Sequence, residues 1–207
     1  MQHGVSPTSR HGGGEPGKNE ADSIELTVRQ FDTAQWKSFK QIRIEALRSD
    51  PGCFGSTLES NLSFTQEHWV TWIGAPGNAV MGLYLRKRLI GFNSAVPWSS
   101  SLLPICTSFS WNNRSDQATA YLLGNYIRRL HRGRGYGRYL SRKRLEWTAR
   151  QRRYSRAIIA YRASNLVAQT INAALGFVEV ERRPHVWPDQ SQDTMVIVLK
   201  EFRNRAG

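Results

Sequence analysis

A glycine-rich turn between an apolar run and a basic run is the feature that most constrains the fold of this chain. Residues 118–127 are mostly apolar and β-prone, and residues 138–146 favour a helix. Between them lies Arg132-Gly133-Arg134-Gly135-Tyr136-Gly137. Glycines leave backbone N–H groups uncovered, and the positive end of the following helix dipole points at the same place. The order strand, turn, helix therefore predicts a site for a phosphate or diphosphate.

Two familiar phosphate-binding patterns do not fit this turn. A P-loop needs Lys followed by Ser or Thr after its last glycine, whereas Arg138 and Tyr139 follow Gly137. A dinucleotide-binding turn needs the spacing G-x-G-x-x-G and an acidic residue about twenty positions later, and neither is present. Arg- and Gly-rich runs also occur as solvated turns and in disordered RNA-binding segments, so the turn alone leaves those alternatives open.

The pattern that remains is R-x-x-G-x-G, formed by Arg132, Gly135 and Gly137. It resembles the pyrophosphate loop of the GNAT superfamily, the general-control-type N-acetyltransferases, which bind acetyl-CoA at such a strand-to-helix turn. The same superfamily carries Asn, Ala, Gly and Phe further along the chain, at relative positions 0, +3, +11 and +12. Here these are Asn165, Ala168, Gly176 and Phe177. The resemblance covers residues 24–202 and is the reason to expect a GNAT-like protein.

The resemblance implies a fold, a cofactor and a reaction. The fold is α/β (α+β): a single GNAT-like domain with a central mixed, mostly antiparallel sheet flanked by helices. The reaction is transfer of an acetyl group from acetyl-CoA to a primary amine, by direct attack in a ternary complex. The acceptor, a small molecule or a peptide, is not identified by the sequence. A monomer or a homodimer fits equally well.

The resemblance also assigns cofactor contacts residue by residue. In the family the strand before the turn splays from its neighbour, and its backbone holds pantetheine and faces the thioester. The amides of the turn bind the diphosphate, with the Arg132 and Arg138 side chains as charge partners. The assigned residues are Tyr126, Ile127, Arg132, Gly133, Arg134, Gly135, Tyr136, Gly137, Arg138 and Asn165.

The catalytic groups depart from the family pattern. A tyrosine seven residues after the motif asparagine usually protonates the leaving thiolate, but Asn172 occupies that position. An amide cannot give up a proton, so Tyr161 or water is the expected substitute. Residues 117–137 contain no Asp or Glu, which leaves His131 as a candidate base on this stretch. Other candidates are Glu59, His185 and Asp193. We expect no single essential base, because an amine can lose its proton through a water chain.

The acceptor side is assigned by family analogy alone. The segment from Ala46 to Ser56 resembles one that borders the acceptor in many GNAT members, and it contains Phe54. Aromatic and histidine side chains elsewhere are expected to line the same side, together with the loop over residues 97–115. The residues expected to bind the acceptor are Phe54, Trp69, Trp72, His185 and Trp187.

Composition bounds the class of protein. The 207 residues, 40% of them hydrophobic, suit one domain with its own core. Cys53 and Cys106 have no metal-ligand spacing, so no metal is expected, and a catalytic Cys106 is the minor alternative to two free thiols. The N-terminus lacks the apolar core of a secretion signal, and no apolar run is long enough to span a membrane. A cytoplasmic protein without membrane contact is expected.

The positive charge is concentrated. The formal net charge is +13, and twelve basic residues between Arg128 and Arg156 face one acidic residue, Glu146. A cofactor with three phosphates accounts for some of these charges. The others form either a solvated helix face or a dock for an acidic partner such as RNA or the ribosome. The alternative function is therefore a catalytically weak acyl-CoA-binding or RNA/ribosome-associated basic module of the same fold.

The pattern along the chain predicts three segments and their elements. Residues 1–22 read as a disordered tail, 23–203 as the GNAT-like domain and 204–207 as a C-terminal tail. A helix is expected from Thr33 to Ser49, and its apolar side is formed by Trp36, Phe39, Ile42, Ala46 and Leu47. A second helix is expected after a cap within residues 63–67, then a hairpin of two strands over residues 79–85 and 89–96. A loop is expected over residues 182–192. In the helix over residues 164–175, one side is expected to pack inward and the amide side to face the cofactor. The inward side is Val167, Ala168, Ile171, Ala174 and Leu175; the amide side is Asn165, Gln169 and Asn172.

Overall fold

The computed structural model describes residues 25–98 and 118–202. Both predicted tails, Cys106 and almost all of the 97–115 loop lie outside the described residues. The strands are β1 (Leu26–Gln30), β2 (Ala79–Leu85), β3 (Arg88–Pro97), β4 (Thr119–Ile127), β5 (Arg156–Arg162), β6 (Val178–Val186) and β7 (Gln192–Glu201). The α-helices are α1 (Trp36–Ser49), α2 (Leu58–Leu62), α3 (Gln66–Gly74), α4 (Tyr136–Arg150) and α5 (Leu166–Ala174). Short 3-10 turns are η1 (Thr33–Gln35), η2 (Pro51–Cys53) and η5 (Arg129–His131).

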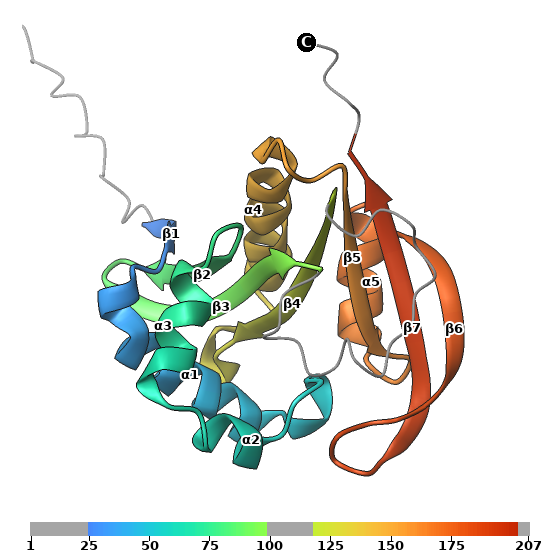
Figure 1. Cartoon of the computed structure of the whole chain (residues 1–207), viewed down its shortest axis with the longest axis horizontal. Coiled ribbons are helices and arrows are strands. Elements are labelled where there is room, and N and C mark those ends of the chain that lie inside the picture. Colours follow the sequence, from blue (N-terminus) through green and yellow to red (C-terminus); the bar gives the residue numbers. More distant parts are fainter. Residues whose placement is uncertain (1–24, 99–117, 203–207) are drawn as a thin grey trace, which may run out of the picture.

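The described strands form one seven-stranded sheet in the order β1-β2-β3-β4-β5-β7-β6. Every neighbouring pair is antiparallel except β4 and β5, which are parallel. The predicted fold class, a mixed and mostly antiparallel sheet flanked by helices, is confirmed. The β4–β5 pairing ends after Tyr121 and Ile158, and the two strands then diverge (Figure 1). We call this unpaired stretch, Leu122–Ile127 of β4 opposite Ile159–Arg162 of β5, the strand gap.

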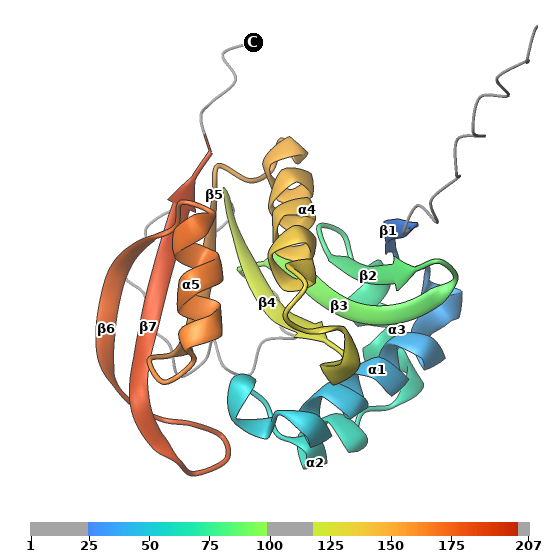
Figure 2. The same cartoon turned by 180° about the vertical axis from the view of Figure 1, so that it is seen from behind.

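Helices cover both faces of the sheet (Figure 2). Helices α1, α2 and α3 lie on one face, and α4 and α5 lie on the other. The predicted apolar stripe of α1 is confirmed, because Phe39, Ile42, Ala46 and Leu47 are all buried against the sheet and α3. Tilted and edge-on aromatic rings around Phe39 fill this first layer. The strand gap therefore lies between two well-packed layers.

Helix α3 begins after Thr65, whose side chain closes a capping box with His68, so the cap predicted within residues 63–67 is confirmed. Two other local predictions were wrong. Strand β6 continues to Val186, within the segment predicted as a loop, because it pairs with β7 along its length. On α5 the amide of Asn172 is buried while Val167 and Ala174 are exposed, so the predicted faces of this helix do not hold. Tertiary packing on the sheet, rather than side-chain polarity, sets the orientation of α5.

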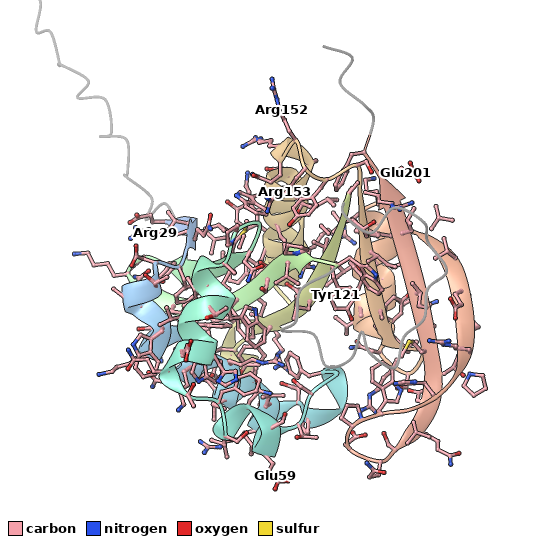
Figure 3. All side chains as sticks on the ribbon, viewed as in Figure 1. Arg29, Glu59, Tyr121, Arg152, Arg153 and Glu201 are labelled. Atoms are coloured by element: carbon pink, nitrogen blue, oxygen red, sulfur yellow. The ribbon has the colours of Figure 1, made fainter. Side chains whose placement is uncertain are left out.

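A β-bulge interrupts β4 beside the strand gap. In the β3–β4 ladder Ser94 pairs with Leu123 and Asn93 pairs with Asn125, which leaves Gly124 as the extra residue. Gly124 has φ +53, a backbone conformation that glycine adopts without strain. Tyr121 marks the last paired position of β4 next to β5 and lies near the centre of the molecule (Figure 3). The bulge thus lies close to the narrow end of the gap.

Among the described helices none combines the length and the apolar character needed to cross a bilayer. The predicted cytoplasmic location stays a prediction.

Candidate active site

The glycine-rich turn forms an open cradle of backbone N–H groups. Gly133 and Gly135 adopt φ +76 and +77, and Gly135 is the N-cap of α4 without a side-chain cap. The first helical bond runs from Tyr139 N–H to the Gly135 carbonyl, 3.0 Å. Within the described residues, the N–H groups of residues 133–138 have no hydrogen-bond acceptor. Unpaired amides at a helix start are the geometry that binds phosphate oxygens.

The three glycines of this turn have different surroundings. A Cβ placed on Gly133 or Gly135 would meet no atom within 4 Å, so both face open space. A Cβ on Gly137 would lie 3.4 Å from Ile171 Cδ1, because the first turn of α4 packs against α5. The cradle is therefore open where Gly133 and Gly135 lie.

The Arg132 side chain is occupied within the protein. Its Nη1 and Nη2 donate to both oxygens of Asp50, at 3.0 and 2.5 Å, and its Nε donates to the Ile127 carbonyl, 2.8 Å. The hydrogen bond from Arg132 is the main reason that the pKa of Asp50 lies below its ordinary value. This guanidinium fastens the turn to the end of α1, which disagrees with its predicted role as a charge partner of the diphosphate. Arg134 and Arg138 are exposed and remain candidates for that role.

The pairing of β4 with β3 determines which peptide groups of β4 face the strand gap. Arg128 N–H donates to the Ile90 carbonyl, 2.9 Å, so Arg128 faces β3. Successive residues face alternate sides, which directs the peptide groups of Tyr126 toward β3 and those of Ile127 into the gap. The peptide groups of Asn125 point into the gap, as those of Ile127 do. Of the two residues predicted to hold pantetheine, Ile127 has the suitable orientation, whereas Tyr126 does not.

Asn125 was missed by the sequence reasoning. It is exposed although it lies within a central strand, and its Nδ2 donates to the Gly137 carbonyl, 3.4 Å. This contact joins the strand that borders the gap to the first turn of α4. A single amide in an otherwise apolar run of β4 was the signal that would have identified it.

The Tyr126 side chain points to the α1 side, where it joins a partly buried network with Glu45 and Arg128. Its hydroxyl donates to Glu45 Oε1, 3.1 Å, and Glu45 is held by Arg128 through bonds of 2.8 to 3.1 Å. Burial raises the pKa of the Tyr126 hydroxyl. Glu45 is a carboxylate next to β4, although it lies outside residues 117–137. Its pairing with Arg128 leaves it poorly suited to act as a base.

The three predicted catalytic residues do not converge. Asn172 is 5% exposed on α5, and within the described residues its side chain has no hydrogen-bond partner. Tyr161 lies on β5 near Glu179 and Arg182, and burial raises its pKa. His131 lies in η5 near Arg88, Arg134 and Arg128, and desolvation and these cations lower its pKa. The structure brings no predicted acid and base together.

The remaining predicted residues have structural partners. Asn165 is the N-cap of α5, and its Oδ1 accepts a hydrogen bond from Ala168 N–H, 3.0 Å. Asp193 accepts from the Ser164 hydroxyl, 2.5 Å. Glu59 lies on α2 at the outer edge of the molecule (Figure 3). The capping role of Asn165 leaves its Nδ2 atom available for a cofactor contact.

Four of the five predicted acceptor residues belong to the buried core instead: Phe54, Trp69, Trp72 and Trp187. Trp69 is 0% and Trp72 is 5% exposed, and their rings stack at 6.1 Å between centroids. An acceptor cannot reach them, so this prediction is corrected. Phe54 is buried under the Arg43 guanidinium, 4.6 Å from its ring centre, and His185 packs edge-on against Trp187 at 5.0 Å. His185 is the most accessible of these three.

The end of β5 carries a further buried cation near this acceptor side. Arg162 donates to Asp189, 2.8 Å, and its guanidinium lies 4.6 Å from the ring centre of Trp187. Hydrogen bonds from Ser191 and Arg162 lower the pKa of Asp189 to about 2. Arg162 therefore fixes the loop between β6 and β7 against β5, beside Trp187.

Comparison with known proteins supplies the context for this geometry. A sequence profile described as the Acetyltransferase (GNAT) family matches residues 36–177. No curated protein sequence matches the chain. The fold is similar to a putative acetyltransferase, yncA, from Salmonella typhimurium, solved with its cofactor acetyl-CoA. The TM-score is 0.69 at 16% identity, over 88% of this chain and 97% of that one.

Two further solved structures have a similar fold. One is a ribosomal-protein-alanine N-acetyltransferase from Brucella melitensis, with TM-score 0.64 at 18% identity over 85% of this chain and 99% of that chain. The other is NAA60 from Arabidopsis thaliana in complex with a bisubstrate analogue. Its TM-score is 0.61 at 14% identity, over 86% of this chain and 99% of that chain. At these identities the likeness concerns the fold.

Proposed function

The chain belongs to the GNAT acetyltransferase family, with acetyl-CoA as its acyl donor, and we propose that it is an N-acetyltransferase acting on a primary amine. The acceptor is a small molecule or a peptide, and the amine attacks the thioester directly in a ternary complex. Solved neighbours that act on ribosomal-protein alanine or bind a bisubstrate analogue support an amine acceptor.

One observation carries the proposal: the unpaired N–H groups of residues 133–138 lie at one end of a strand gap that runs along β4. The cradle holds an anion, and the gap gives an extended chain access to the peptide groups of Asn125 and to the N–H of Ile127, whose carbonyl accepts from Arg132. Holding both ends of a thioester in this way aligns its carbonyl for attack and replaces a bimolecular encounter by an oriented one.

The described residues offer no free carboxylate on β4 for proton removal. The amine proton therefore leaves through water, and the protein contributes binding, orientation and electrostatics. His185, the accessible one of the five predicted acceptor residues, stays in the proposal as an acceptor contact. The pantetheine contact that we assigned to Tyr126 passes to Asn125, with Ile127 retained.

Titration calorimetry with acetyl-CoA is the direct test of the donor site. We expect acetyl-CoA to bind with micromolar affinity, and we expect free CoA to abolish this binding by competition. Release of CoA in the presence of a panel of amines, peptides and polyamines then identifies the acceptor class. Absence of heat at high micromolar acetyl-CoA would remove the proposal.

A second candidate is a binding module that holds acyl-CoA or an acidic partner without turnover. Asn172 in the tyrosine position favours it, as do the exposed cations at the end of α4, where Arg152 points away from the molecule (Figure 3). Tight acetyl-CoA binding with no CoA release above background for any amine would select this candidate. Binding of RNA that salt weakens steeply would identify the partner as nucleic acid.

A further inference from the structure

A buried arginine from α4 reaches the backbone carbonyl groups around the bulge in β4. Arg144 Nη1 donates to the carbonyls of Leu123, 2.9 Å, and Ser94, 3.1 Å, and lies 3.5 Å from that of Gly124. Only 3% of Arg144 is exposed. Its guanidinium therefore lies against the bulge from the α4 side of the sheet.

A second buried arginine approaches the same bulge from the α1 side. Arg43 Nε donates to Asn61 Oδ1, 3.1 Å, and its Nη2 donates to Ser56 Oγ, 2.6 Å. Its remaining nitrogen, Nη1, has no acceptor among the described residues. That nitrogen lies 3.6 Å from the position a Cβ on Gly124 would occupy, and Arg43 is 3% exposed. The Arg43 guanidinium, which also lies over the rings of Phe54 and Phe92, is thus close to the bulge on the α1 side.

Both arginines are charged, and no described carboxylate balances them. Within the described residues neither forms a salt bridge. Burial lowers the pKa of Arg43 and of Arg144 to about 9, well above neutral pH, so both remain cationic. Buried cations without a carboxylate partner are costly. They favour the placement of a negative charge between them.

The bulge lies where such charge would arise during acyl transfer. The diphosphate cradle is at the wide end of the strand gap, after Ile127, and the gap narrows toward the last β4–β5 pair at Tyr121. The acyl end of acetyl-CoA lies far from its diphosphate, which directs that end toward the bulge. This step rests on the proposed function.

We propose that Arg43 and Arg144 are positioning residues for acyl transfer, which stabilise negative charge at the Gly124 bulge and let the CoA thiolate depart without a proton donor at position 172. In that reaction a bond forms between the amine nitrogen and the acyl carbon, and the carbon–sulfur bond breaks. The electron pair stays on sulfur as thiolate, and the amine proton passes to water. Two fixed cations thereby take over the electrostatic part of the role of the missing tyrosine.

The test measures the thiol pKa of bound CoA from the ultraviolet absorbance of its thiolate. In the wild-type complex the pKa is expected to lie below that of free CoA by about one unit, because nearby cations favour the charged form. Arg43→Met and Arg144→Met should each return at least half of that shift. Arg43→Lys and Arg144→Lys, which keep the charge, should preserve most of it.

Matched controls come from the same helices. Arg48→Met on α1 and Arg142→Met on α4 remove exposed cations and should leave the thiol pKa and the CoA affinity unchanged. A wild-type complex that binds CoA normally with an unshifted thiol pKa would overturn this inference while leaving the proposed function intact. Equal effects of the buried and exposed variants would also overturn it.

The remaining outcomes are equally decisive. If Arg144→Met does not fold, the comparison of Arg43→Met with Arg43→Lys decides the matter, because Arg43 hydrogen bonds only to side chains and not to the bulge carbonyls. If wild-type protein does not bind CoA at all, calorimetry shows it directly, and the proposed function and this inference fall together.

Discussion

The two ends of the strand gap are built for negative charge in different ways. At the wide end, backbone N–H groups of residues 133–138 face open space at the start of α4. At the narrow end, the guanidinium groups of Arg43 and Arg144 are buried against the bulge from both faces of the sheet. Amides at a helix start are already oriented and solvated, so they bind an anion at little cost to folding. Buried guanidinium groups lose their hydration and persist only where other atoms hold them.

This difference separates the expected effects of substitution. Changes at the amide cradle should lower cofactor affinity and leave stability nearly intact. Changes at the buried arginines should alter stability and the electrostatics of the reaction. Four variants test that contrast.

The largest effect is expected for Arg144→Met. It removes the hydrogen bonds that the buried Arg144 donates to the carbonyls of Ser94 and Leu123, so the free energy of unfolding should fall by about 2–4 kcal/mol. Urea denaturation measures this value. Arg142→Met, two residues along the same helix, removes an exposed side chain that lies 3.8 Å from Glu146 and should cost less than about 0.5 kcal/mol. Similar losses for the two variants would contradict the structural role of Arg144.

Gly135→Ala should act mainly on the cofactor. Its φ of +77 is strained for alanine by about 1 kcal/mol, and the relaxed turn would rotate its N–H groups away from the diphosphate. Acetyl-CoA affinity measured by calorimetry should therefore fall about tenfold or more, whereas the loss of unfolding free energy stays near the strain. Gly52→Ala is the control, because Gly52 also faces open space but has no positive φ. Unchanged affinity in Gly135→Ala would argue against the cradle.

The pH dependence of stability in Asp50→Asn tests the contact between the glycine-rich turn and the end of α1. The bond from Arg132 holds the folded pKa of Asp50 below its ordinary 3.8. Its stabilising contribution is therefore complete above about pH 4 and disappears as pH falls through the folded pKa. Wild-type unfolding free energy should drop more steeply on acidification than that of Asp50→Asn. Glu59→Gln, an exposed carboxylate on α2, serves as control and should follow the wild-type curve.

The smallest effect is expected for Asn172→Ala. Its side chain has no hydrogen-bond partner among the described residues, and its carbonyl, which accepts from Phe177 N–H, is retained in the variant. Turnover with the amine found in the acceptor panel, and the thiol pKa of bound CoA, should both change by less than about threefold. A loss of tenfold or more would assign Asn172 a catalytic role and weaken the case for the buried arginines.

Much of the frame was predictable because its signals are local. The α1 stripe, the β2–β3 hairpin and the mostly antiparallel sheet follow from apolar spacing and from the resemblance. The face of α5 was not predictable, since Asn172 is buried and Val167 is exposed against their polarity. Trp69 and Trp72 were assigned to the acceptor side because aromatic residues suit both binding surfaces and cores, and only packing distinguishes the two.

The amino-acid sequence by itself determined the anion cradle, because its glycines, its helix start and its unpaired amides all lie within a few consecutive residues. The tertiary structure alone decided the role of Arg43 and Arg144. Arginine in a helical run reads as a surface residue, and nothing local to either position indicates burial. Their juxtaposition needs a bulge in β4, a helix on each face of the sheet and a glycine at 124, which come together only when segments distant in the chain pack around one strand.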